Sequence, residues 1–173
     1  MPDGYTDSDP IAPAALPGGR FAGREAFQQL VRDALVCAAR EGWRELIVSD
    51  ATFEDWPLRE RLVVESLKAW AKPGRRFVML AHRYDALQRD QPRFVTWRKT
   101  WGHIIECRVC RTVDLQDFPS VLWSPAWGMR RLDLQRCGGV SGSEPDRRVA
   151  LRELLDEHLR NSTSGFASSV LGL

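Results

Sequence analysis

Residues 45–81, ELIVSDATFEDWPLRERLVVESLKAWAKPGRRFVMLA, contain two short apolar runs with one amphipathic segment between them. The runs at 45–49 and 76–81 have the length and the aliphatic content of buried strands. Between them, Pro57 suits the first turn of a helix, and apolar side chains at helical spacing continue to about Ala71. Pro73-Gly74 then ends that helix. This order predicts a strand, a crossover helix and a second, parallel strand.

The flanking sequence extends this alternation in both directions. Before the unit, apolar side chains at helical spacing predict a helix over 24–41, which Gly42 ends. After it, the helical pattern at 83–101 divides in two because Pro92 interrupts it, and Asp90 is suited to cap the second piece. We therefore expect an α/β domain with a mixed, mostly parallel sheet and helices on both faces. The remaining predicted elements are a third strand at 103–109, a hairpin of strands at 120–123 and 129–134, a loop at 138–143 and a helix at 146–159.

Length and composition favour one domain. The chain has 173 residues, enough to bury a core without disulfides or metals. Its start is rich in proline and glycine, so we expect a disordered tail at 1–23 and a single domain at 24–173. The net charge of +2 is too small to predict a nucleic-acid partner by itself. The sequence shows neither a secretory signal nor a membrane-spanning run, so we expect a cytoplasmic protein with reduced cysteines.

Several stretches carry a resemblance to a known family. RRFVMLAHR at 75–83, QPRF at 91–94 and HIIECR at 103–108 follow one another in the predicted β-α-β order, and LLDEHLRNS at 154–162 and LGL at 171–173 close the chain. Over about residues 24–173 the sequence resembles one half of the phospholipase D-like fold, and it is most similar to a bacterial branch of that superfamily. The resemblance implies the α/β fold of one such half.

The motif that gives this family its activity is missing. Family enzymes carry a His-x-Lys pair with a downstream Asp; the histidine attacks phosphorus and the lysine stabilises the phosphate oxygens. Here the residues two positions after His82, His103 and His158 are tyrosine, isoleucine and arginine. Family enzymes also need two active halves, and this chain supplies one. The missing motif and the missing second half argue against phosphodiesterase activity. Two hypotheses stay open: a non-catalytic role, or a homodimer that reproduces the two-half arrangement.

A ligand site is predicted where the parallel strands end. Open α/β sheets bind ligands at the carboxyl ends of their strands. Ser49, Asp50 and Thr52 follow the first predicted strand, and His82 and Arg83 follow the second. An adjacent histidine and arginine can bind a phosphate or a carboxylate. The structural alternative is that His82 caps a strand end and that Arg83 is solvated.

The cysteines give a weaker metal hypothesis. Cys107 and Cys110 match Cys-x-x-Cys, but they lie at the end of a predicted strand, where residues three apart point to opposite faces. This placement disfavours both a disulfide and shared metal ligation. His103, Cys107, Cys110 and Cys137 are all of zinc-ligand type, yet no second Cys or His pair supports a zinc site. We expect buried structural cysteines and no cofactor.

Two further groups of residues have functional and structural interpretations. Arginines and lysines come in pairs, which can line a phosphate-binding surface if they converge, or lie as solvated faces if they do not. These pairs are Arg75-Arg76, Arg98-Lys99, Arg130-Arg131 and Arg147-Arg148. Trp123 and Trp127 flank a proline-containing turn, where they either anchor a partner or cover the sheet; we favour the covering role.

Three hypotheses about function follow. The first is a non-catalytic phospholipase D-like domain that acts as a binding or interaction module, with a protein partner or a second copy of itself. The second is a phosphate- or nucleic-acid-binding protein that uses the arginine pairs and His82. The third is an enzyme of another class that works from His82, Asp50 and Ser49 at the strand ends.

Overall fold

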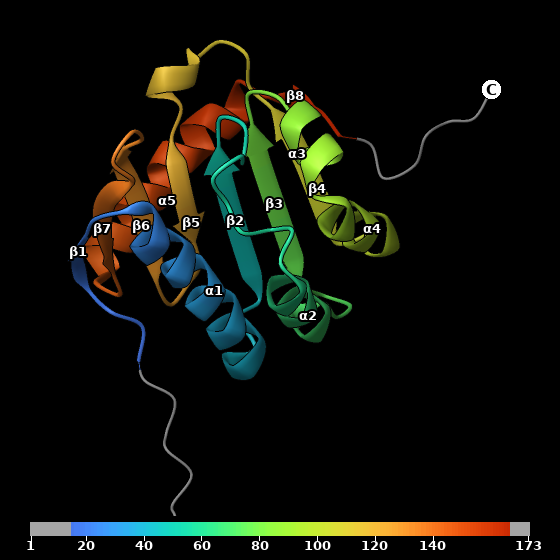
Figure 1. The fold of residues 1–173 in the computed structure, drawn as a ribbon, viewed down its shortest axis with the longest axis horizontal. Helices are drawn as coiled ribbons and strands as arrows, with labels where there is room; N and C mark the ends of the chain where they lie inside the picture. Colours follow the sequence, from blue (N-terminus) through green and yellow to red (C-terminus); the bar gives the residue numbers. More distant parts are fainter. Residues whose placement is uncertain (1–14, 167–173) are drawn as a thin grey trace, which may run out of the picture.

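The central layer of the molecule is one mixed β-sheet. The computed structural model describes residues 15–166. Within this range eight strands form a sheet in the order β1-β7-β6-β5-β2-β3-β4-β8 (Figure 1). The strands are β1 Gly19–Phe21, β2 Glu45–Asp50, β3 Arg76–Ala81, β4 Ile105–Val109, β5 Ser120–Trp123, β6 Gly128–Asp133, β7 Gly138–Gly142 and β8 Thr163–Ser164.

Parallel pairing is confined to the centre of this sheet. β2 pairs with β3, and β3 with β4, in parallel, as the alternation of strands and helices predicts. β2 pairs with β5 in antiparallel orientation, and β5, β6 and β7 continue as an antiparallel meander. The α/β class and the mixed sheet are confirmed. The sheet is less parallel than expected because β1, β7 and β8 add antiparallel pairs that the sequence did not reveal.

The helices are distributed unequally over the two faces. α1, α2, α3 and α4 pack on one face, and α5 packs on the other (Figure 1). Alternation along each strand divides the core accordingly: Leu46 and Val48 face the first layer, while Ile47 faces α5. The helices are α1 Arg24–Glu41, α2 Arg61–Trp70, α3 Asp85–Asp90, α4 Pro92–Thr100 and α5 Pro145–Arg160, and a short 3-10 helix, η1, spans Leu115–Asp117.

The predicted tail boundary at residue 24 lies too late. Gly19–Phe21 form β1, which pairs with β7 at one edge of the sheet. The predicted loop at 138–143 contains β7, which pairs with β6 on its other side. A Cβ on Gly139 would lie 2.0 Å from the carbonyl oxygen of Arg130, so close strand packing requires glycine there. Both strands were missed because glycine-rich sequence has no strand periodicity.

The other local predictions have mixed outcomes. The pattern at 83–101 does divide at Pro92, into α3 and α4. Asp90 does not cap α4: the N-cap is Gln91, and the Asp90 carboxylate accepts hydrogen bonds from Arg89 instead. The apolar side chains near the end of the sequence, Phe166, Val170 and Leu171, predict that the chain docks back on the domain, and Phe166 does so beside Tyr84. The same expectation for Val170 and Leu171 lies outside the described residues.

Among the described residues, no helix has the length and apolar content needed to cross a membrane.

Candidate functional site

Ser49, at the end of β2, stabilises the fold. Its side chain is fully buried, and its hydroxyl donates a hydrogen bond to the carbonyl oxygen of Pro119 at 2.8 Å. This bond ties the end of β2 to the chain that enters β5. Because the hydroxyl proton is used in that bond, the structure gives Ser49 a structural role at the strand end.

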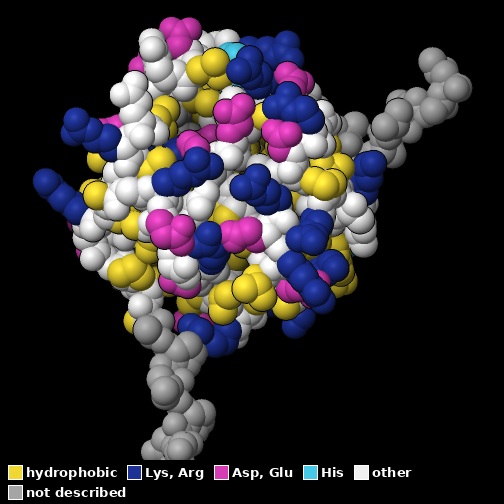
Figure 2. Space-filling view, viewed as in Figure 1, with side chains coloured by type: hydrophobic (Ala, Val, Ile, Leu, Met, Phe, Trp, Pro, Cys, Tyr) yellow, Lys and Arg dark blue, Asp and Glu magenta, His cyan; other side chains and the backbone are white. Residues whose placement is uncertain are grey.

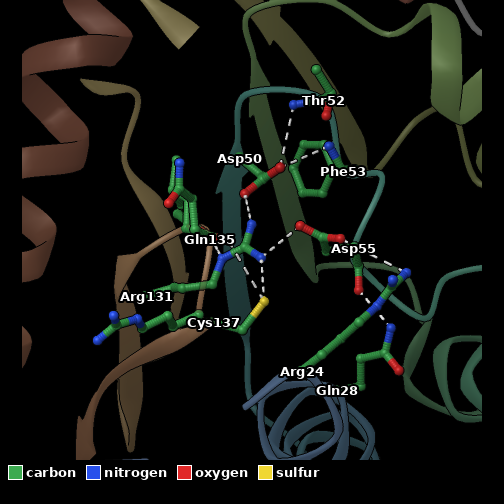
Figure 3. Close-up of polar contacts among 12 residues, drawn as sticks. Arg24, Gln28, Asp50, Thr52, Phe53, Asp55, Arg131, Gln135 and Cys137 are labelled. Carbon is green, nitrogen blue, oxygen red and sulfur yellow. Dashed lines mark hydrogen bonds and ion pairs between the residues drawn. The ribbon is translucent and has the colours of Figure 1, made fainter. Parts of the chain in front are cut away.

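Asp50 belongs to a buried ion network centred on Arg131 of β6 (Figure 3). Nη2 of Arg131 donates to Asp50 Oδ1 at 2.9 Å, and Nη1 donates to Asp55 Oδ2 at 2.8 Å. Nε donates to the hydroxyl of Ser120 at 3.2 Å, and the guanidinium lies 4.5 Å from the centre of the Phe27 ring. Arg131 is only 4% exposed. Burial by itself lowers the pKa of Arg131, but the neighbouring carboxylates outweigh it, so the pKa is raised and the guanidinium stays charged.

The other oxygen of Asp50 shapes the loop that follows β2. Asp50 Oδ2 accepts hydrogen bonds from the backbone N–H groups of Thr52, at 3.2 Å, and Phe53, at 2.8 Å (Figure 3). Phe53 has φ of 60°, an unfavourable conformation for a bulky residue that this carboxylate helps to hold. We name residues 51–60, between β2 and α2, the β2–α2 loop.

Two glutamines hold the β2–α2 loop from outside. The Gln91 side chain donates from Nε2 to the carbonyl oxygen of Phe53 at 2.9 Å. The Gln28 side chain, on α1, donates from Nε2 to the carbonyl oxygen of Asp55 at 2.8 Å (Figure 3). The Arg131 network and these two bonds together tie the loop to the sheet and to the helices.

His82 and Arg83 lie apart from this network. The His82 ring packs edge-on against Phe118, with ring centres 6.3 Å apart. The Arg83 side chain is exposed and lines a shallow pocket of about 300 Å³ with Arg111 and Ser164. Ser49, Asp50, His82 and Arg83 are therefore not gathered into one ligand site: Ser49 and Asp50 are engaged within the fold, and Arg83 faces a pocket.

The four proposed metal ligands are also separated. Cys107 packs in the core beneath α1–α4, whereas Cys110 packs with Leu80 and Phe118 on the opposite side of the sheet. This confirms the opposite orientation predicted for the two cysteines. Cys137 contacts Arg131, and the exposed His103 stacks on Trp101. Within residues 15–166, no group of three or more His, Cys, Asp or Glu side chains is placed to hold a metal ion. Burial raises the pKa of the Cys107 thiol to about 11.

The basic pairs do not converge either. Arg75 lies over the Trp70 ring, and Arg76 pairs with Glu45 and Glu106 on the α5 side of the sheet. Arg98 is buried and donates to the carbonyl oxygen of Phe166. The remaining pairs are divided among β6 and the start of α5. Trp123 and Trp127 are both buried, which agrees with their predicted covering role.

Exposed cationic side chains gather instead along the groove between α2 and α4. This α2–α4 groove has a volume of about 510 Å³ and is lined by Arg61, Val64, Lys68, Arg93, Trp97 and Trp101, with Glu65 among them. Figure 2 shows Lys and Arg side chains over α2 and α4, at the lower right of the molecule. Within the described residues, neither Arg61 nor Arg93 takes part in an ion pair.

A second, more polar pocket lies beside the β2–α2 loop. It holds about 350 Å³ and is built from α1, the loop and the junction of α3 with α4. We name it the loop pocket; its lining includes Arg24, Gln28, Trp56, Arg59, Glu60 and Gln91. Its position near the end of β2 is the region where the sequence predicted a site, but different side chains form it. These side chains can be identified only from the contacts that the folded loop makes.

Comparison with family models and with curated proteins finds no match for this chain. Among solved structures, the fold is similar to that of TrmBL2, an archaeal chromatin protein described as showing a novel mode of DNA binding. The TM-score is 0.62 over 93% of this chain, at 13% sequence identity. The match covers 57% of the TrmBL2 chain, so the present chain spans little more than half of that protein. At this identity, the likeness establishes a shared fold.

Proposed function

We propose that this domain binds nucleic acid through the α2–α4 groove. The observation that carries the proposal is a single groove with cationic side chains on its rim and indole rings in its wall. Arg61, Lys68 and Arg93 supply the charge, and Trp101, which is partly exposed, supplies the ring that can stack; Trp97 also lines the groove but is buried. Cations attract the phosphate backbone, and aromatic faces stack on unpaired bases.

The distribution of charge supports this groove more than the total charge does. The net charge is only +2, but α4 carries no acidic residue and α2 carries one, Glu65. The chain has three lysines, and all of them lie on or next to these two helices: Lys68, Lys72 and Lys99. Helix C-termini also favour lysine, which accounts for part of this placement at Lys99.

The aromatic side chains favour single strands. Trp101 is partly exposed, and its ring is tilted against that of His103, with centres 5.5 Å apart and an interplanar angle of 31°. Trp97 is buried, so Trp101 is the indole that a base can reach. Bases in a duplex are stacked on one another and cannot reach such a surface, whereas bases of a single strand can.

Two likenesses are consistent with this function. TrmBL2, which shares the fold, is described as a DNA-binding protein. A phospholipase D-like origin is also consistent, because a half-domain without the His-x-Lys pair can retain affinity for a phosphodiester that it does not cleave. The phospholipase D-like origin and self-association of the domain are both parts of this proposal.

Fluorescence anisotropy with a labelled single-stranded 20-mer, titrated at increasing KCl, tests the proposal. We expect binding whose affinity falls with salt, and a log–log slope shallower by roughly 0.7 for Arg61→Ala and again for Arg93→Ala, the value for one phosphate contact on a single strand. Trp101→Ala should weaken binding by about 1–3 kcal/mol. The matched control is Arg20→Ala, an exposed arginine on the distant strand β1. Absence of binding at low salt, or equal effects of Arg20→Ala and Arg93→Ala, would contradict the proposal.

A further inference from the structure

A pocket of about 300 Å³ lies where β3 and β4 end, between the start of α3 and the chain at 163–166. In Figure 1, α3 and β8 lie side by side at this end of the sheet. We name it the β8 pocket, because β8 forms one of its walls. Most of the side chains that line it are polar or charged, and none of them belongs to the lining of the α2–α4 groove.

Two arginines in this lining follow neighbouring parallel strands. Ala81 ends β3 and Val109 ends β4; they are register partners, and both pack on the α1–α4 side of the sheet. Arg83 and Arg111 each come two positions later, so alternation directs both to that same side. The backbone N–H of Cys110 donates to the carbonyl oxygen of Ala81 at 3.0 Å, which keeps the two chains together past the strand ends. Both arginine side chains accordingly line the one pocket.

The charge of these two arginines is not neutralised within the described residues. Arg83 and Arg111 are exposed, and within residues 15–166 the side chain of neither makes a hydrogen bond or an ion pair. Like charges at neighbouring positions of a sheet are destabilising. Asp85 is the one acidic side chain among the residues that line the pocket, so the lining keeps a net positive charge. An anion held by both guanidinium groups would remove their repulsion.

The other walls of the pocket supply neutral hydrogen-bonding groups. Thr163 and Ser164 form β8, and both are exposed. The hydroxyl oxygen of Ser164 accepts a long hydrogen bond from Arg108, at 3.4 Å, so its proton is still available to a ligand. The exposed amide of Gln88 on α3 adds a further donor. Hydroxyl and amide donors therefore face the same space as the two arginines.

The wall formed by β8 is held in place without a ligand. Nη2 of Arg108 donates to the carbonyl oxygen of Ser162 at 2.7 Å, and the backbone N–H of Gly165 donates to the carbonyl oxygen of Cys107 at 3.0 Å. A Cβ on Gly165 would lie 2.2 Å from a methyl carbon of Val109, so this close approach to β4 requires glycine. A wall that is already ordered reduces the entropy lost on binding.

We infer that the β8 pocket binds the phosphoryl group of a small phosphomonoester. A phosphoryl group has three acceptor oxygens, which two guanidinium groups and a hydroxyl can share, whereas a single guanidinium already engages both oxygens of a carboxylate. The Asp85 carboxylate repels a second acidic group, so the rest of the ligand is neutral or cationic. The volume of about 300 Å³ is at the small end of the range for ligand sites. The inference does not rest on the function proposed for the α2–α4 groove.

An NMR titration of ¹⁵N-labelled protein with methyl phosphate tests the inference. At about pH 7.5 this probe is largely a dianion. Methyl sulfate, a monoanion of the same shape, and acetate are the comparison ligands. We expect saturable shifts of the backbone amides at 163–165, with the tightest binding for methyl phosphate. Arg83→Gln and Arg111→Gln should each weaken that binding roughly 10- to 100-fold, as loss of a charged hydrogen bond does. Both side chains are exposed, so these variants should fold normally.

Two further variants show whether the pocket, and not general charge, binds the probe. Asp85→Asn removes the negative charge from the lining and should strengthen methyl phosphate binding by a few fold. The matched control is Arg89→Gln, an exposed arginine of α3 that pairs with Asp90 outside the pocket; it should leave binding unchanged. Equal losses for Arg89→Gln and Arg83→Gln would overturn the inference. So would acetate binding as tight as that of methyl phosphate, or the lack of saturable shifts at 163–165. Oligonucleotide binding by the groove is decided separately, by its own variants.

Discussion

The Arg131 network and the α2–α4 groove use the same kinds of side chain in opposite ways. Arg131 is buried and has a partner for nearly every donor, whereas Arg61 and Arg93 are exposed and have no ion pair among the described residues. Buried charges are tolerated only when they are paired, so the network holds the fold together. Exposed unpaired charges contribute little to stability and stay available to a ligand. Burial and pairing separate the structural arginine from those that we propose to bind nucleic acid.

Replacing Arg131 should have the largest effect on stability. Arg131→Leu leaves Asp50 buried without its countercharge, and we expect the free energy of unfolding to fall by about 3–5 kcal/mol. Urea denaturation followed by circular dichroism measures the loss. Arg130→Ala, the neighbour on the opposite face of β6, serves as the control and should change stability by less than about 0.5 kcal/mol. Similar losses for both variants would remove the distinction between the two regions.

Asp55→Asn should have an intermediate effect. The Asp55 side chain is 36% exposed, so water can partly replace its pairing with Arg131. We expect a loss of about 1–2 kcal/mol, because Arg131 keeps Asp50 as its partner. The same urea denaturation gives the value. A loss as large as that of Arg131→Leu would mean that Asp55, and not Asp50, is the main countercharge.

Removing the cationic rim of the groove should hardly alter stability. In the triple variant Arg61→Ala, Lys68→Ala and Arg93→Ala, we expect the free energy of unfolding to change by about 1 kcal/mol or less, since exposed charges contribute little. Its anisotropy titration should nevertheless show the largest loss of oligonucleotide affinity. A cooperative loss of structure in this variant would show that these three side chains stabilise the fold and are not available to a ligand.

Glu65→Gln should give the smallest change in stability and the opposite change in binding. Glu65 lies in the groove, 3.4 Å from Lys68, with both side chains more than half exposed. Its removal frees Lys68 and lowers the negative charge, so oligonucleotide affinity should rise by a few fold at low salt and less at high salt. Unchanged or weaker binding would place the nucleic acid elsewhere.

The parts of the fold that follow periodic patterns were predictable from the sequence. The unit of β2, α2 and β3, the break at Pro92 and the hairpin of β5 and β6 all carry local signals, and the structure confirms them. β1 and β7 carry no such signal. They are strands because a partner strand offers them hydrogen bonds, which is a tertiary effect.

The candidate site was harder to predict because its contacts join distant residues. Arg131 and Asp50 are 81 positions apart, and Gln91 and Phe53 are 38 apart. One signal was present: in a strand that includes Met129, alternation places Arg131 on the same inward face, so this member of the basic pair needed a buried carboxylate. The loop pocket had no comparable signal, since its walls come from three segments that only folding brings together.

The two outermost strands of the described sheet have a consequence for assembly. β1 has three residues and β8 has two, and each lies at an edge beside a longer neighbour. An edge this short offers few free backbone groups for another chain to join, which guards against open-ended stacking of molecules into fibres. If two copies of this protein associate, we therefore expect them to meet through side chains on a helix or sheet face.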